Sequence, residues 1–371
     1  MFIVALCGII LILNLKKCKI YLNLGVYMKK VVIFIFAAIL LSMSYNAGAG
    51  NVIVLIYHRI GNPKYPTTNV SVKRFREQMK YLKVHHYNVI ALKELIYDLK
   101  HHHHLRKKGV VITIDDGFKS VYNNAFPILK KYRYPFSVFL PTKSIQHHYP
   151  AYMNLKQIRE MMQYGADFES HSYAHAHMAY MKKKMSIQSY KLWIRNDLKK
   201  SILFFKKTFG YRPVALAFPY GDYNKILIET AKILGFECLL TQDMGSVDEN
   251  TPLWLIPREP ILGTYFSTMK HFKEVLNIKN LDIRKRYPEI GILNGKHRII
   301  GAKIANINKY KRNTFMIYTT ICGWRKASIN KDIVYIYDDN CLNRKKVRIG
   351  IKAREKNTNR KAMNMWMVIN R

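Results

Sequence analysis

Residues 110–118 read Val-Val-Ile-Thr-Ile-Asp-Asp-Gly-Phe, an apolar, mostly β-branched run that ends in two adjacent carboxylates and a glycine. Such a run is typical of a strand buried on both faces of a parallel sheet. Asp115 and Asp116 follow the predicted strand, residues 110–114, directly. The catalytic residues of barrel enzymes lie at the carboxyl ends of the strands, so we interpret both aspartates as site residues.

On both sides of this strand, short apolar runs alternate with segments whose apolar residues recur at the spacing of an α-helix. Further strands are predicted over residues 52–57, 89–92, 136–140, 167–170, 214–218 and 237–241. Helices are predicted after a Ser71 cap and over residues 93–100, 119–131 (apart from Pro127), 155–163, 186–209 and 225–234. This alternation predicts an α/β fold with a parallel sheet and helices outside it. We expect a distorted or partial (β/α) barrel over residues 50–275, with an open doubly wound sheet as the second interpretation.

The pattern changes after residue 275. Short alternating or apolar runs follow at residues 298–307, 314–319, 333–337, 347–353 and 363–369, separated by Asn, Gly and Lys turns. Several short strands of this kind predict a small C-terminal β-rich domain, and we expect a basic β-rich module over residues 276–371. Its aromatic residues leave glycan binding open, although a structural or docking role is the simpler interpretation.

The 371-residue chain is strongly basic, with 62 Lys and Arg against 23 Asp and Glu and a net charge of +39. Such a charge attracts nucleic acid, anionic lipid or acidic glycans without choosing among them. The lysines are spread along the chain, and no helix-turn-helix, RNA-binding or zinc-finger pattern is found. We therefore expect no specific nucleic-acid partner and retain an anionic envelope surface as a partner. The sequence does not predict the oligomeric state.

Residues 1–49 contain two apolar runs. The second has the order of a secretory signal peptide: Met28-Lys29-Lys30, an apolar stretch over residues 31–41, and small residues at 47–49. We predict cleavage after Ala49 and export to the periplasm, cell envelope or exterior, with residues 1–27 arising from an upstream start codon. The alternative is an N-terminal membrane anchor.

Cleavage would leave Cys238, Cys322 and Cys341. An oxidising compartment allows two of them to pair, and only Cys322 and Cys341 fall within one predicted domain. Three buried thiols are an equally good interpretation.

A histidine pair follows the predicted strand at residues 167–170, in the string His-Ser-Tyr-Ala-His at residues 171–175. Two imidazoles and one carboxylate form a ligand set that leaves open positions on a metal ion. A second carboxylate beside such a site can act as a general base. The two strand ends together therefore predict a catalytic metal site.

The strings at residues 113–117 (TIDDG) and 171–175 (HSYAH) resemble the first two motifs of the polysaccharide deacetylase family, the NodB-like carbohydrate esterase family 4. The resemblance implies that Asp115 is the catalytic base and that Asp116, His171 and His175 hold a divalent metal. Zinc is expected first, with cobalt, nickel or manganese as alternatives. His177 is an alternative to His175.

The third family motif is similar to Ala217-Phe218-Pro219-Tyr220-Gly221, but its usual arginine, which braces the catalytic aspartate, is missing, and Arg212 is no obvious substitute. This departure resembles the poly-N-acetylglucosamine deacetylase branch. The resemblance implies that the Tyr220 backbone amide stabilises the oxyanion of the tetrahedral intermediate.

His58 and Pro219 match the same branch, so the resemblance implies a substrate-binding role for them, and Arg258 is a further candidate for contacting the substrate. Arg258 can instead fix the aspartate, and His58 can instead be structural. No clear Leu-x-His string for the family's general acid follows the last predicted barrel strand, where residues 254–260 (WLIPREP) stand instead.

These motifs predict hydrolysis of N-acetyl groups from a β-linked N-acetylglucosamine polysaccharide. Poly-N-acetylglucosamine is the first substrate, followed by peptidoglycan and chitin oligomers. The alternative is a non-catalytic envelope protein that binds glycan on a deacetylase fold. A nucleic-acid protein, suggested by charge alone, ranks last.

Overall fold

The computed structural model describes residues 50–181, 185–293, 295 and 297–370. All of these belong to one compact unit. The predicted leader, residues 1–49, lies outside the described residues. Among the described helices, none is both long and apolar enough to cross a membrane.

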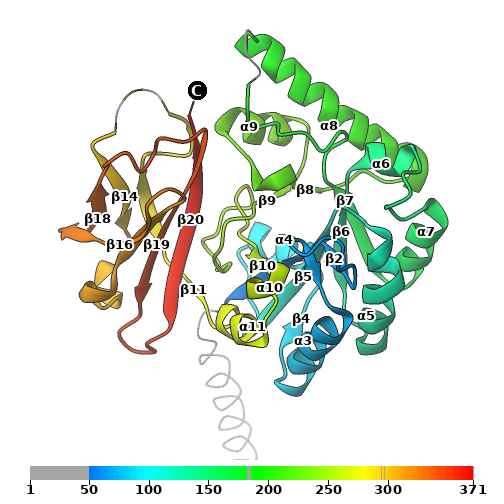
Figure 1. The fold of residues 1–371 in the computed structure, drawn as a ribbon, viewed down its shortest axis with the longest axis horizontal. Coiled ribbons are helices and arrows are strands. Elements are labelled where there is room, and N and C mark those ends of the chain that lie inside the picture. Colours follow the sequence, from blue (N-terminus) through cyan, green and yellow to red (C-terminus); the bar gives the residue numbers. More distant parts are fainter. Residues whose placement is uncertain (1–49, 182–184, 294, 296, 371) are drawn as a thin grey trace, which may run out of the picture. The chain divides into compact units, whose positions relative to one another are not determined.

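The N-terminal part of this unit is built on a parallel sheet with the strand order β10-β1-β5-β6-β7-β8-β9, with β4 pairing with β5 (Figure 1). Its strands are β1 Val52–Tyr57, β4 Asn88–Val89, β5 Gly109–Asp115, β6 Phe136–Leu140, β7 Ala166–Ser170, β8 Ala215–Ala217, β9 Cys238–Leu240 and β10 Glu259–Pro260. A short parallel pair, β2 Arg59–Ile60 and β3 Asn69–Val70, lies beside it. The sheet curls into a partial barrel, which confirms the predicted fold class.

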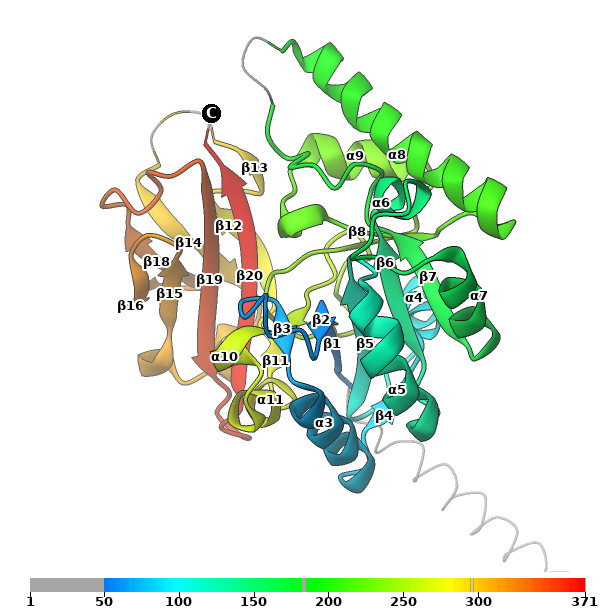
Figure 2. The same cartoon turned by 45° about the vertical axis from the view of Figure 1, so that its right-hand side comes forward.

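Helices connect the strands, and most of them cover the outer side of the sheet, whereas the helix Leu92–Lys100 packs against the inner-face residues of the strands (Figure 2). They are α3 Val72–Val84, α4 Leu92–Lys100, α5 Phe126–Tyr132, α6 Thr142–Gln146, α7 Leu155–Gln163, α8 Ile187–Phe209, α9 Lys225–Ile233, α10 Gly263–Phe266 and α11 Met269–Val275. The Ser71 side chain accepts a hydrogen bond from the Arg74 amide and caps α3, as predicted. Strands and helices in this half agree closely with the expected alternation.

The central strands are buried on both faces because two hydrophobic clusters sandwich them. In β1, Ile53 and Leu55 pack in the cluster that contains the outer helices α3, α5 and α7, whereas Val52 and Val54 pack in the barrel interior. The same alternation holds in β5, where Val111 points to the interior. Continuous burial explains why these strands appear in the sequence as unbroken apolar runs.

Two predicted barrel elements differ from the structure by more than one residue at an end. The strand expected at residues 89–92 is only two residues long, because Ala91 already caps α4 and Leu92 begins it. The helix expected at residues 119–131 is split into a π-helical turn, Val121–Ala125, and α5. Pro127 lacks an amide hydrogen, and the preceding Phe126 amide donates to the Val121 carbonyl five residues back, which is the π-helical spacing.

The C-terminal part consists of β-rich sheets, as predicted. One contains β11 Lys279–Asn280, β13 Gly291–Ile292, β15 Met316–Thr319, β16 Gly323–Lys326, β19 Lys346–Arg354 and β20 Lys361–Ile369. The other contains β12 Ile283–Tyr287, β14 Ile299–Ile304, β17 Ser328–Asn330 and β18 Ile333–Tyr337. Both sheets contribute to one core around the fully buried Trp366. The boundary at residues 275 and 276 stays a prediction.

Strand β20 contributes to several hydrophobic clusters. Trp366 and Val368 pack in the core of the C-terminal sheets, whereas Met363 and Met365 join the outer barrel cluster. Met367 joins a further cluster around α8 and α9. The C-terminal sheet is therefore attached to the barrel through apolar packing from alternate residues of one strand.

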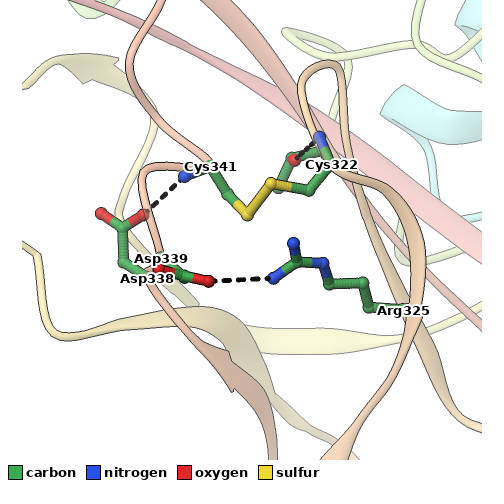
Figure 3. The surroundings of a disulfide bond; sticks show 6 residues. Cys322, Arg325, Asp338, Asp339 and Cys341 are labelled. Carbon is green, nitrogen blue, oxygen red and sulfur yellow. Dashed lines mark hydrogen bonds and ion pairs between the residues drawn. A yellow bond between two sulfur atoms is a disulfide. The ribbon is translucent and has the colours of Figure 1, made fainter.

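A disulfide joins Cys322 and Cys341, whose Cα atoms lie 5.5 Å apart (Figure 3). Hydrogen bonds hold both cysteine amides: Cys341 donates to the Asp338 carboxylate and Cys322 to the Thr319 hydroxyl, each at 3.0 Å. Cys238 is buried as a free thiol. The predicted pairing of Cys322 with Cys341 is confirmed.

Candidate active site

The two aspartates lie at the carboxyl end of β5. Asp115 is the last residue of the strand, one residue beyond its predicted end. Asp116 has a φ of 71° and Gly117 a φ of 69°, so the chain turns sharply at this point. A Cβ atom at Gly117 would lie 2.5 Å from Leu140 Cδ2, so no other residue fits without a shift. The turn separates the two carboxylates, and only Asp116 is slightly exposed.

Asp116, His171 and His175 converge, and their ligand atoms all lie within 4.8 Å of one another. Asp116 Oδ1 is 3.1 Å from His175 Nε2 and 3.6 Å from His171 Nε2. His171 follows β7 directly, and His175 is reached through a turn in which its amide donates to the Ser172 hydroxyl. The structure thus brings together the three side chains that the sequence predicts as metal ligands.

The His171 ring carries its proton on the nitrogen that faces away from the carboxylates. Nδ1 lies 2.8 Å from the Ala217 carbonyl, which can only accept, so this nitrogen is the donor. Burial lowers the pKa of His171 to about 4, which keeps the ring neutral near pH 7. Nε2 is then unprotonated, and its lone pair faces the carboxylates: Asp116 Oδ1 lies at 3.6 Å and Asp115 Oδ2 at 3.8 Å. Acceptors that face one another in this way suit a cation between them.

Asp116 is an anion in this setting. Burial by itself would raise the pKa of Asp116, but the hydrogen bond to His175 and the nearby His58 and His171 lower it far below its usual value. One carboxylate and two imidazoles are the ligand types that zinc and related divalent ions accept in open catalytic sites. The donor set therefore fits a divalent metal.

Arg258 lies against Asp115 in the barrel interior. NH1 donates to Asp115 Oδ1 at 2.7 Å, NH2 donates to Oδ2 at 2.8 Å, and Nε donates to the Thr241 carbonyl at 2.8 Å. Burial would raise the pKa of Asp115, but the Arg258 guanidinium and His171 lower it. Of the two roles that the sequence leaves open for Arg258, the contacts favour fixing the aspartate.

Tyr220 lies at the centre of a tight turn, Pro219–Gly221, that follows β8. Its φ of 59° is in the left-handed region. The Tyr220 ring is 41% exposed, stacks on His177 with a centroid distance of 3.7 Å, and lies 4.6 Å from the His175 ring. The turn therefore reaches the cluster of Asp116, His171 and His175, with Pro219 buried at its start.

The other predicted residues take separate positions. His177 Nδ1 lies 2.7 Å from Asp222 Oδ2, outside the cluster that contains His175. His58 follows β1, whose last residue, Tyr57, pairs with Ile114 of β5, so His58 lies at the same end of the sheet as the two aspartates. Its Nδ1 is buried and has no hydrogen-bond partner among the described residues. Arg212 lines a cavity at the amino ends of β7 and β8, with Ala166 and Val214, and among the described residues it donates no hydrogen bond to Asp115.

Sequence reasoning missed two basic residues next to this site. Lys346 Nζ lies 2.6 Å from Asp222 Oδ1, and Arg348 Nε lies 3.0 Å from Asp243 Oδ1. Both residues come from β19, where basic residues at 346 and 348 alternate with apolar Val347 and Ile349. This alternation is the one signal in the sequence that the two basic side chains share a face.

Comparison with known proteins finds relatives in one family. Residues 102–239 match the sequence profile of the polysaccharide deacetylase family. A poly-beta-1,6-N-acetyl-D-glucosamine N-deacetylase of Staphylococcus epidermidis is 31% identical over 213 residues, which cover 56% of this chain and 73% of that protein. A Staphylococcus aureus protein of the same name is 29% identical over 207 residues, covering 55% of this chain and 71% of the relative.

Solved structures share the fold. The Streptococcus pyogenes deacetylase PplD, in complex with acetate, aligns with a TM-score of 0.55 and 24% identity, over 62% of this chain and 99% of that one. IcaB from Ammonifex degensii aligns with a TM-score of 0.52 and 23% identity, over 62% and 96% of the two chains.

A partial (β/α) barrel with acidic and histidine side chains at the mouth defines a class of barrel hydrolases. Within that class, the chain belongs to the polysaccharide deacetylase family. It is a carbohydrate N-deacetylase, which confirms the enzyme class predicted from the two motifs.

Proposed function

We propose that this protein hydrolyses N-acetyl groups of a β-linked N-acetylglucosamine polysaccharide in a metal-dependent reaction. The observation that carries the proposal is the convergence of Asp116, His171 and His175, with a proton-free His171 Nε2, beside the second carboxylate of Asp115.

Asp116 Oδ1, His171 Nε2 and His175 Nε2 would hold the metal ion, and zinc is the first candidate, with cobalt, nickel or manganese as alternatives. When bound, a divalent ion lowers the pKa of water and polarises the carbonyl that the water attacks. The Ala217 carbonyl fixes the His171 tautomer in which Nε2 is the ligand atom.

Asp115 is proposed as the general base. Its Oδ2 atom lies 3.8 Å from His171 Nε2, so it faces the same space as the ligand atoms. Arg258 donates to both carboxylate oxygens and so fixes their plane, which leaves a lone pair on each oxygen to accept a proton from water. Arg258 thus supplies the brace that the arginine missing from the third motif provides in the family.

Tyr220 is proposed to act through its backbone amide, which would stabilise the oxyanion of the attacked amide carbonyl. A preorganised donor of this kind contributes about 2.7 to 4 kcal/mol to transition-state stabilisation. The exposed Tyr220 ring next to His175 places this turn at the open side of the ligand cluster. His58 and Pro219 are proposed to line the substrate site.

Poly-N-acetylglucosamine is the first substrate, because the staphylococcal relatives are named for deacetylation of the β-1,6-linked polymer. Peptidoglycan and chitin oligomers follow. An aspartate without a brace would favour the non-catalytic alternative, but Arg258 pairs with Asp115 where the third motif lacks its arginine.

Export to the periplasm, cell envelope or exterior is part of the proposal. A disulfide between Cys322 and Cys341 is typical of oxidising compartments. The net charge of +39 favours residence at an anionic envelope surface. N-terminal sequencing of the protein from its host would test cleavage after Ala49 against retention of a membrane anchor.

The experiment that tests the function is acetate release from poly-N-acetylglucosamine, peptidoglycan and chitin oligomers by the metal-stripped protein with zinc or cobalt added back. We expect release that requires metal and is abolished in Asp115→Asn. Asp332→Asn is the control, because Asp332 pairs with Lys303 in the C-terminal sheets. Absence of acetate with every metal and polymer would refute the proposal.

A further inference from the structure

Two basic side chains of the C-terminal sheet reach the loops of the active site. Lys346 and Arg348 are two residues apart in β19, so both point to the same face of the strand. Val347 and Ile349, between and after them, pack in the core of the C-terminal sheets. The polar face of β19 is therefore directed away from its own core, toward the barrel loops.

The Arg348 guanidinium donates hydrogen bonds to one carboxylate and two backbone carbonyls of these loops. Its Nε donates to Asp243 Oδ1 at 3.0 Å, and its NH2 donates to the carbonyl oxygens of Gly221 at 3.2 Å and of Tyr220 at 3.4 Å. Asp243 is buried and also accepts from the Tyr223 hydroxyl at 2.5 Å. The guanidinium thus links a fixed carboxylate to the backbone of the Tyr220 turn.

The turn is strained and closely packed against this guanidinium. Tyr220 has a φ of 59° and Gly221 a φ of 63°, and a non-glycine residue stays in this left-handed region only when its surroundings hold it there. A Cβ atom at Gly221 would lie 2.6 Å from Arg348 NH2 and 2.5 Å from Gln242 Cβ. Glycine at 221 is what allows Arg348 to come within reach of the two carbonyls.

Lys346 contacts Asp222, the residue that directly follows this turn. Its Nζ lies 2.6 Å from Asp222 Oδ1, and Asp222 Oδ2 lies 2.7 Å from His177 Nδ1. The His177 ring is the one on which Tyr220 stacks. Residues of β19 therefore support both parts of Tyr220: Arg348 bonds its backbone carbonyl, and Lys346 acts on its ring through Asp222 and His177.

The position of β19 is itself fixed. It pairs along nine residues with β20, whose Met363, Met365 and Met367 pack in clusters of the barrel. The Tyr223 hydroxyl accepts a hydrogen bond from the Met367 amide at 3.1 Å. Apolar packing thus supports the polar contacts made by Arg348.

We infer that Arg348 is a positioning residue of the deacetylase site, which holds the Pro219–Gly221 turn so that the Tyr220 amide faces the oxyanion. The C-terminal β-rich sheet is then a structural part of the catalytic centre. The inference rests on the proposed function, because it assigns Arg348 a part in that reaction.

The test compares Arg348→Met with Arg354→Met in the full-length protein. Arg354 is on the same strand but is exposed and donates to the Asn359 carbonyl within the C-terminal sheets. The first measurement is kcat and KM for acetate release from poly-N-acetylglucosamine oligomers with zinc. The second is amide hydrogen exchange of Gly221 and Asp222, whose amides donate within the turn to Phe218 and Pro219.

We expect Arg348→Met to lower kcat by at least about tenfold, since misplacement of a catalytic group by 1 Å can cost about a hundredfold, while KM stays nearly unchanged. Exchange of the two amides should accelerate, and Arg354→Met should resemble the wild type in both measurements. Arg348→Met with unchanged kcat or unchanged exchange would overturn the inference.

If Arg348→Met does not fold, Arg348→Lys is judged by the same two measurements, because a lysine keeps the charge but cannot bond Asp243 and both carbonyls together. A wild-type protein that releases no acetate contradicts the proposed function. An Arg348 variant with full activity contradicts only the positioning role.

Discussion

The Arg258 guanidinium forms two parallel hydrogen bonds, of 2.7 and 2.8 Å, with the Asp115 carboxylate, and neither side chain is exposed to solvent. The two residues are 143 positions apart in the sequence. Each charge is compensated only by this contact and a few polar neighbours, so both stability and activity should depend on it.

Arg258→Met should destabilise the protein by about 3 to 5 kcal/mol, because it leaves Asp115 as a buried and uncompensated charge. Urea unfolding measures the loss. Arg258→Met combined with Asp115→Asn should recover part of the stability but none of the activity. Arg325→Met is the control, since Arg325 makes only a partly exposed pair with Asp339 at 3.9 Å (Figure 3). An Arg258→Met variant as stable as this control would contradict the prediction.

His171→Ala should abolish stoichiometric zinc binding. The loss should exceed the roughly 10- to 100-fold loss of affinity typical of residues that only orient a metal ligand. Titration calorimetry with zinc on the metal-stripped protein measures it directly. His104→Ala is a matched control, because His104 is exposed and pairs with Glu249 far along the chain. Equal zinc affinity of His171→Ala and the wild type would remove His171 from the ligand set.

Zinc should also raise the melting temperature of the wild-type protein, because a ligand that binds only the folded state stabilises it by mass action. The shift should be absent in His171→Ala. A wild-type melting temperature that does not respond to zinc would speak against a metal site at Asp116, His171 and His175.

Gly117→Ala should cost more stability than Gly210→Ala. Both glycines have positive φ, 69° and 79°, so the backbone strain from an alanine is similar. Only Gly117 is crowded, with Leu140 Cδ2 2.5 Å from the position of a Cβ, whereas nothing lies within 4 Å at Gly210. Overpacking at Gly117 should therefore add about 1 to 3 kcal/mol to the loss of unfolding free energy. Thermal unfolding of the two variants measures the difference, and equal losses would show that the Asp115–Gly117 turn adjusts freely.

Glu259 should make stability fall as pH rises. Burial raises the pKa of Glu259 from 4.5 to about 8, so between these values the folded state keeps a proton that the unfolded state has lost. The contribution is fully present below about pH 4.5, is lost between pH 4.5 and 8, and amounts to a few kcal/mol at about 1.4 kcal/mol per pKa unit. Glu259→Gln, which stays neutral, should show a smaller decline in unfolding free energy from pH 5 to pH 9. An identical decline in both proteins would refute this assignment.

Much of the barrel could be predicted because its strands are buried on both faces. β1 and β6 were predicted with their observed ends, as was helix α7, whose Asn154 and Gln157 form a capping box. The exposed strands β16 and β17 were missed, since a strand without a buried face carries no apolar pattern.

The residues of the candidate site likewise differ in whether they follow a buried strand, and those that do could be predicted. Asp116, His171 and His175 could be predicted because each stands directly after, or in a short string after, a buried strand. Arg348 could not, because its contacts to Tyr220 and Gly221 span 128 and 127 residues and depend on how two sheets pack. The catalytic and ligand roles of these residues stay predictions until the variants are measured.

Strand β20 is translated after every other strand of this sequence, yet its side chains complete hydrophobic clusters in both the barrel and the C-terminal sheets. A nascent chain that has emerged only as far as residue 275 would therefore expose the apolar surface that Met363, Met365 and Met367 later cover. Premature termination anywhere before Lys361 would therefore remove side chains that complete the hydrophobic clusters of the deacetylase barrel, in addition to truncating the C-terminal sheets.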